Sequence, residues 1–197
     1  MRGPTWEDVS GGVGPRVTVP VTMGPDEAAR ELAPRLSALA GERAPASSGE
    51  GGARPGVPVV TIDGYSGSGK STLAAALARL VNGWQVLHLD DWYPGWDGLA
   101  EGAHIARRIA ADLRGGRASS YEAWDWENGR TGAMISVPLA PTIIEGCGAW
   151  DADADLSVWI ADPGEDERRS RALARDGQTY APHWQRWADQ DLGRSLP

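Results

Sequence analysis

Apolar residues recur along this chain in two spacings, one typical of strands and one typical of helices. Short aliphatic or β-branched runs, which favour buried strands, lie at 57–63, 84–89, 142–145 and 156–161. Apolar residues three or four positions apart predict helices over about 70–81 and 99–113, from about 165, and over about 183–191. Because strands alternate with helices, the pattern predicts a parallel sheet covered by helices on both faces.

The first 56 residues follow a different pattern. Residues 1–25 are rich in Gly and Pro, with one candidate strand at Arg16–Val21. Asp26 is a predicted N-cap for an amphipathic helix that contains Pro34, and residues 41–56 have the composition of a linker. We therefore expect 1–56 to form an arm ahead of a main domain at 57–197. The arm is either a tail with one docked helix or a helix that binds a partner.

The composition excludes several classes of protein. A length of 197 residues is enough for about one domain with a buried core. The net charge of −8 argues against a nucleic-acid partner held by a basic surface, and no apolar run is long enough to cross a bilayer. The N-terminal residues lack the apolar core of a signal peptide, and the single cysteine, Cys147, fits a reducing compartment. We therefore expect a cytoplasmic protein without nucleic-acid or membrane partners, whose oligomeric state the composition leaves open.

One segment carries a specific chemical signal. GYSGSGKST, residues 64–72, matches G-x-x-x-x-G-K-[ST] between a predicted strand and a predicted helix, and it contains Lys70, the single lysine among 19 basic residues. The glycines allow a tight turn whose N–H groups cradle anionic oxygens, and the start of the helix adds its positive dipole end. Lys70 would reach the β- and γ-phosphates, and the Ser71 hydroxyl is a hard oxygen ligand for Mg²⁺. The segment therefore predicts a nucleotide-binding P-loop with ATP and Mg²⁺ as cofactors, bound by Gly64, Ser66, Gly67, Ser68, Gly69, Lys70, Ser71 and Thr72.

Two carboxylates follow later strands, as phosphoryl transfer requires. Asp90 ends the second strand, where it would lie beside the γ-phosphate and accept the proton of a substrate hydroxyl. Glu145 ends the apolar strand 142–145, the position of a residue that holds Mg²⁺ through a water. We predict Asp90 as the catalytic base and Glu145, with Ser71, as the metal site.

A stripe of arginines supplies candidate cations. Arg168, Arg171 and Arg175 share one face of the predicted helix. Either they form a lid near 165–178 that covers the triphosphate and neutralises the transition state, or they form a solvated face. Together with the phosphate loop, they favour the lid.

These segments together resemble the uridine kinase family of nucleoside kinases. GYSGSGKST resembles its phosphate loop, LDDWY its D-S-F-Y segment, and WDW at 124–126 its Y-D-F segment. IIEG resembles its F-E-G strand end, and RRSRALARD at 168–176 its arginine lid. The match covers residues 57–178 in the same order. The resemblance implies a P-loop NTPase fold, a three-layer α/β/α sandwich with a mainly parallel sheet of four or five strands. It also implies an ATP-dependent phosphotransferase with a small-molecule acceptor.

The resemblance also implies which residues contact the acceptor, and it is imperfect there. Tyr93 aligns with the family's tyrosine, Trp124 and Asp125 fall in its base-pocket segment, and Asp97 is a candidate for binding ribose hydroxyls. Trp124 replaces a tyrosine, so a hydroxyl contact is lost while stacking can remain. The clustered tryptophans either wall an acceptor pocket or fill the core in place of the missing Phe: Trp92, Trp96, Trp124 and Trp126.

Two further questions stay open from the sequence. The family's last core strand has no counterpart here, so the sheet has either four strands or an edge strand from Arg16–Val21. The chain is either a kinase for a nucleoside, sugar or other hydroxyl compound, or a nucleotide-binding regulatory module without acceptor chemistry.

Overall fold

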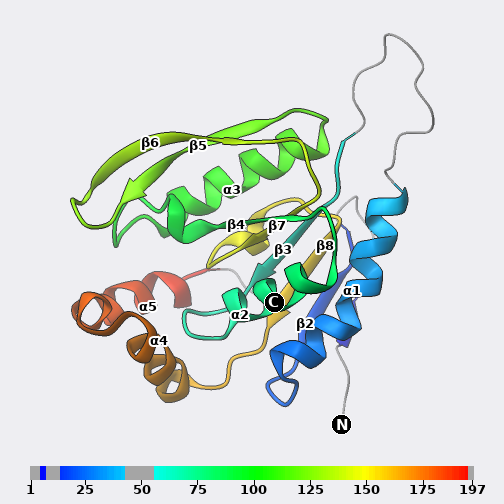
Figure 1. The fold of residues 1–197 in the computed structure, drawn as a ribbon. Coiled ribbons are helices and arrows are strands. Elements are labelled where there is room, and N and C mark those ends of the chain that lie inside the picture. The colour runs from blue at the N-terminus through cyan, green and yellow to red at the C-terminus, as the bar shows by residue number, and fades with distance from the viewer. Residues whose placement is uncertain (1–4, 8–13, 43–55, 195–197) are drawn as a thin grey trace.

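A six-stranded sheet forms the centre of the computed structural model, which describes residues 5–7, 14–42 and 56–194 (Figure 1). The strand order is β1-β2-β8-β3-β7-β4. The strands are β1 (Thr5–Glu7), β2 (Arg16–Val19), β3 (Val59–Asp63), β4 (Gln85–His88), β7 (Thr142–Glu145) and β8 (Leu156–Ile160). All neighbouring pairs are parallel except β1 with β2. This confirms the predicted α/β class with a mainly parallel sheet, which has five parallel strands.

Helices cover both faces of this sheet and make the three layers. They are α1 (Pro25–Glu42), α2 (Lys70–Leu80), α3 (Leu99–Arg114), α4 (Glu165–Tyr180) and α5 (Trp184–Leu192). One core packs α1 and α2 on one face of the sheet, and a second core packs α3 and α5 on the other. The central strands β3 and β8 are buried along their whole length, as expected for strands between two helical layers. None of the described helices combines the length and apolar content of a membrane span.

The N-terminal strand completes the sheet. β2 pairs in parallel with β8, with Val17 opposite Val158, so a strand from the start of the chain extends the sheet on the side that the sequence left open, and β1 pairs outside it. Leu32 and Leu36 of α1 are fully buried against the same core, and α1 continues through Pro34. Residues 16–42 therefore share the sheet and core of the rest of the chain. Most of the linker-like stretch lies outside the described residues, and the division of the chain at residue 56 stays a prediction.

A two-stranded hairpin was not expected from the hydrophobic pattern. It consists of β5 (Ser119–Asp125) and β6 (Arg130–Val137), and it lies beside α3 (Figure 1). Seven of the eight residues of β6 are exposed, so this strand lacks the apolar signature of a buried strand.

Candidate active site

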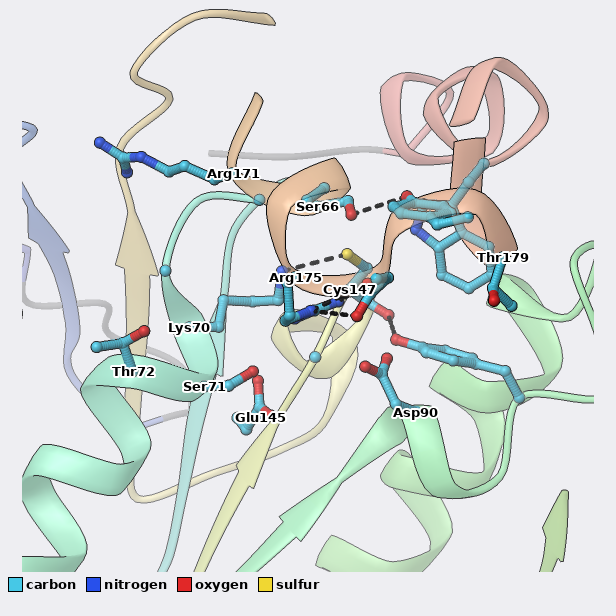
Figure 2. Close-up of a pocket in the computed structure, with 18 of the residues that line it drawn as sticks. Ser66, Lys70, Ser71, Thr72, Asp90, Glu145, Cys147, Arg171, Arg175 and Thr179 are labelled. Atoms are coloured by element: carbon cyan, nitrogen blue, oxygen red, sulfur yellow. Dashed lines mark hydrogen bonds and ion pairs between the residues drawn. The ribbon is translucent and has the colours of Figure 1, made fainter. Parts of the chain in front are cut away.

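The phosphate loop, Asp90 and Glu145 meet at the carboxyl ends of adjacent parallel strands. The loop follows β3, Asp90 lies in the turn after β4, and Glu145 ends β7. They line one pocket of about 910 Å³ together with α4 and α5 (Figure 2). In open α/β sheets ligands bind at this end of the strands. The structure thus brings the predicted loop and the two predicted carboxylates into a single site.

The loop has the backbone of an anion cradle. Gly67 and Gly69 adopt φ values of +80° and +106°, which side chains rarely allow. The Lys70 ammonium donates to the carbonyl oxygens of Gly64 and Tyr65 at 2.8 and 3.1 Å. Burial lowers the pKa of Lys70, but the surrounding acidic groups raise it by more, so its pKa lies above the ordinary value and the ammonium stays charged.

Most of the predicted phosphate-binding residues line the pocket: Ser66, Gly67, Gly69, Lys70, Ser71 and Thr72. Gly64 and Ser68 do not. Gly64 contributes its carbonyl to Lys70, and the Ser68 hydroxyl is buried with no hydrogen-bond partner in the described structure.

Oxygen donors suited to a magnesium ion lie at the start of α2 and the end of β7. Figure 2 shows the Ser71 hydroxyl and the Glu145 carboxylate directed toward the same part of the pocket. A hydroxyl and a carboxylate are the hard ligands that Mg²⁺ prefers, so this donor set fits the ion. Glu145 also accepts a hydrogen bond from Nδ1 of His88 at 2.5 Å. That bond, against the opposing effect of burial, raises the pKa of His88.

Asp90 lines the pocket from the turn after β4. Its carboxylate is accessible from the pocket, but the protein atoms around it limit its hydration and raise its pKa above the ordinary value. The charge of Glu145 raises this pKa further, while Arg175 and Lys70 lower it. The backbone carbonyl of Asp90 accepts a hydrogen bond from the Trp126 indole at 2.7 Å, which ties the turn to the hairpin.

Two of the three arginines of the predicted lid line the pocket, and the third does not. Arg171 and Arg175 line the pocket, and each forms an ion pair on α4, with Glu167 and Asp176 respectively. The charge of Arg175 acts on Asp90 and Glu145, whereas Figure 2 shows Arg171 extending away from these two residues.

Arg168 is placed differently from the predicted lid position. Only 4% of its side chain is exposed, and it donates to Asp162 and to the Ser66 carbonyl. Its guanidinium also lies over the rings of Tyr65 and Trp184. The i, i+3 spacing places Arg168 one turn closer to the loop than Arg171, where it anchors the helix and does not face the pocket.

Aromatic rings form another part of the pocket lining. Trp96, Trp126, Tyr180 and Trp187 line the pocket, and we call these four residues the aromatic wall. Trp96 stacks on Tyr180 with ring centroids 5.3 Å apart and planes 11° from parallel. Tyr93 also lines the pocket, with its hydroxyl donating to the Cys147 carbonyl at 2.7 Å. Two tryptophans of the predicted cluster therefore face the pocket, whereas Trp92 is buried in the core.

Three predicted acceptor contacts lie outside the pocket lining. Asp97 pairs with Arg186 on α5, and Asp125 accepts hydrogen bonds from Asn128 in the hairpin turn. Trp124 lies in β5, near Gly95. Contact of these three residues with an acceptor stays a prediction.

Sequence reasoning missed several buried polar residues around the loop. Asp63, Asp191 and Arg194 form a hydrogen-bonded chain behind it, and the Cys147 thiol lies 3.4 Å from the Lys70 ammonium. The one local signal was Asp63, a carboxylate at the end of an otherwise apolar strand. Asp191 lies among polar residues of α5 and Arg194 follows that helix, so the local sequence does not mark either residue as buried.

No protein-family model matches the chain, and no curated protein matches it in sequence. Among solved structures, a protein proposed to be a fructose transport system kinase, from Silicibacter sp. TM1040, is similar with a TM-score of 0.50 and 21% identity, covering 84% of this chain and 96% of that one. A protein proposed to be a uridine kinase, from Bacillus stearothermophilus, has a TM-score of 0.45 and 21% identity over 82% and 92% of the two chains. D-glycerate 3-kinase from Cryptococcus neoformans has a TM-score of 0.40 and 13% identity over 83% and 68%. The chain therefore shares its three-layer α/β fold with the first of these structures, which is the fold class that the sequence predicts.

Proposed function

We propose that this protein is an ATP- and Mg²⁺-dependent kinase that transfers the γ-phosphate to a hydroxyl group of a nucleoside or a similar small metabolite. The observation that carries the proposal is the shared pocket. A phosphate loop with a buried, charged lysine, a carboxylate at the end of β4 and an aromatic wall all line it. Phosphoryl transfer depends mainly on positioning and on charge stabilisation, and each of these parts has a residue here.

The nucleotide side would be formed by the loop and α4. The amides of residues 67–72 and the start of α2 would bind the phosphate oxygens, and Lys70, which two loop carbonyls hold in place, would direct its charge toward the β- and γ-phosphates. Arg175 and Arg171 would close over the transferring group, which requires each to leave its carboxylate partner. Bound Mg²⁺ supplies positive charge to the phosphates, and Ser71 with Glu145 would hold it.

Asp90 is the residue placed to take the proton of the acceptor hydroxyl. It lines the same pocket as the phosphate loop and the aromatic wall, and neither Lys70 nor Arg175 is hydrogen-bonded to it in the described structure. Its raised pKa brings the carboxylate closer to the operating pH and so makes it a better proton acceptor.

The lining of the acceptor side indicates the acceptor's chemistry. Flat rings favour a ligand with an apolar face, and the carboxylates Asp90 and Asp91 accept hydrogen bonds but do not donate them while ionised. Hydroxyl groups on a flat or cyclic body satisfy both conditions.

We also propose the cytoplasm as the compartment, since the buried Cys147 is a free thiol.

The test is transfer of label from γ-labelled ATP to a panel of nucleosides, sugars and other hydroxylated metabolites. A labelled product with one acceptor class would support the proposal. Tight ATP binding without a labelled product from any acceptor would instead favour a regulatory nucleotide-binding module.

A further inference from the structure

Residues of α4 and α5 form hydrogen bonds with the N–H, the carbonyl and the hydroxyl of Ser66 in the phosphate loop. The N–H of Ser66 donates to Oδ2 of Asp191 at 2.8 Å, and its carbonyl accepts from Arg168 at 3.3 Å. Its hydroxyl lies 2.8 Å from that of Tyr180. The middle of the loop is therefore fixed by α4 and α5, which lie more than 100 residues away in the sequence.

The contact with Asp191 continues into a buried chain of charges. The other oxygen of Asp191 accepts two hydrogen bonds from the Arg194 guanidinium, at 2.7 and 3.0 Å. The same guanidinium donates to both oxygens of Asp63, at 2.8 and 3.1 Å. The side chains of Asp191, Arg194 and Asp63 are 1%, 8% and 0% exposed.

The far end of this chain also lies on the loop. Asp63 accepts the N–H of Gly64, the first loop residue, at 2.6 Å, and the N–H groups of Gly148 and Trp150 at 2.9 and 2.8 Å. Arg194 thus connects α5 with the start of the loop and with the turn after β7. The loop is fixed at Gly64 and Ser66, on either side of Tyr65.

Stability alone does not account for such an arrangement. Moving charges out of water is costly, and well-packed apolar side chains of similar volume often stabilise a protein as much or more. Here, however, both ends of the buried chain bind N–H groups of the loop, and the carbonyls between those groups hold the Lys70 ammonium. A loop that is already in its binding shape loses less conformational entropy when phosphate arrives.

We propose that Asp191 and Arg194 are positioning residues that hold the phosphate loop and Lys70 in the anion-binding arrangement before nucleotide is bound. This inference rests on the proposed function, because it assumes that the loop binds phosphate. Neither residue lines the pocket, so each acts through the loop and without touching the nucleotide.

The test is calorimetric titration of Mg·ADP into the full-length Asp191→Ala and Arg194→Met variants. Each variant is expected to raise Kd by about tenfold or more, as loss of a charged hydrogen bond predicts. The double variant should bind only about as weakly as the weaker single variant, because both changes break one network. In turnover assays, KM for ATP should rise while kcat at saturating ATP stays within about threefold, because bound nucleotide restores the loop.

Two controls separate positioning from a general structural role. Asp189→Asn changes a carboxylate on the same helix that is exposed and bonded to Gln185, and its Kd should stay within about twofold of wild type. Asp191→Asn keeps the size of the side chain and one acceptor oxygen for Ser66, so it should fold even if Asp191→Ala does not, with Kd raised about three- to tenfold.

Two outcomes would overturn the inference. Folded Asp191→Asn and Arg194→Met proteins with wild-type Kd would show that the network only stabilises the fold, and the proposed function would stand. Wild-type protein that does not bind Mg·ADP would remove the proposed function together with this inference.

Discussion

The hydroxyl of Ser66 in the phosphate loop lies 2.8 Å from the hydroxyl of Tyr180 in the aromatic wall. One hydrogen bond therefore joins the side of the pocket that would bind ATP to the side that would bind the acceptor. Burial raises the pKa of Tyr180, so this hydroxyl stays protonated and available as a donor.

Removing either hydroxyl should weaken turnover without unfolding the protein. Tyr180→Phe keeps the stacking on Trp96, and Ser66→Ala keeps the backbone contacts of the loop. Each change should lower kcat/KM about three- to tenfold, as expected for the loss of one buried hydrogen bond. The double variant should have about the same kcat/KM as the more impaired single variant. Additive losses in this double-mutant cycle would show that the two hydroxyls act separately.

Lys70→Arg should abolish ATP-dependent activity although it conserves charge. The carbonyls of Gly64 and Tyr65 and the Cys147 thiol lie around the ammonium, a compact charge with rotatable donors that a larger, planar guanidinium does not reproduce. We expect Mg·ATP binding to weaken by about a hundredfold or more, measured by calorimetry. Arg79→Lys, an exchange at an exposed position of the same helix, is the matched control. A fully active Lys70→Arg protein would mean that this loop does not act as a P-loop.

The acid limb of the pH–rate profile should follow the protonation of Asp90 and should shift when Arg175 is replaced. The limited hydration of the carboxylate and the charge of Glu145 raise the pKa of Asp90, and Arg175 lowers it. Transfer should therefore fall as the pH drops through a value above the ordinary range of an aspartate, and Arg175→Gln should move that limb to higher pH. Arg171→Gln is the control, since Arg171 has no comparable effect on this pKa, and its profile should keep the wild-type midpoint. Identical limbs in wild type and Arg175→Gln would argue against Asp90 as the titrating base.

The hydrogen bond between His88 and Glu145 should make stability depend on pH. Because the bond raises the pKa of His88 above 6.5, its contribution is fully present below pH 6.5 and is lost as pH rises through the folded-state value. His88 is half-exposed, so solvent screening limits the effect of His88→Gln to about 1 kcal/mol. Chemical unfolding of wild type and His88→Gln should differ more at pH 6 than at pH 9. A difference that is equal at both pH values would contradict an ionised His88–Glu145 pair.

The parts of the site that are local in sequence could be predicted, and the parts that depend on packing could not. The loop, Asp90 and Glu145 each follow a strand of clear pattern, and parallel strands bring their carboxyl ends together. Arg168 shares the spacing of Arg171, but only tertiary structure shows that it is buried between Tyr65 and Trp184.

The pairing of β2 with β8 and the buried network of Asp63, Asp191 and Arg194 could not be predicted from the sequence, because both depend on contacts between distant parts of the chain. The strand β2 is short, its partner β8 lies about 140 residues later, and no local signal fixes that pairing. Asp191 stands among polar residues of α5, so nothing in its neighbourhood marks it as buried against Ser66.

The measurement that tests the account most directly compares transfer and binding in wild type and Asp90→Asn. Wild-type protein with Mg·ATP should label one class of hydroxyl acceptor. Asp90→Asn should lose that transfer by about a thousandfold or more, as expected for a missing general base, while its Kd for Mg·ATP stays within about threefold. Full transfer by Asp90→Asn, or no labelled product from the wild-type protein with any hydroxyl acceptor, would contradict the account.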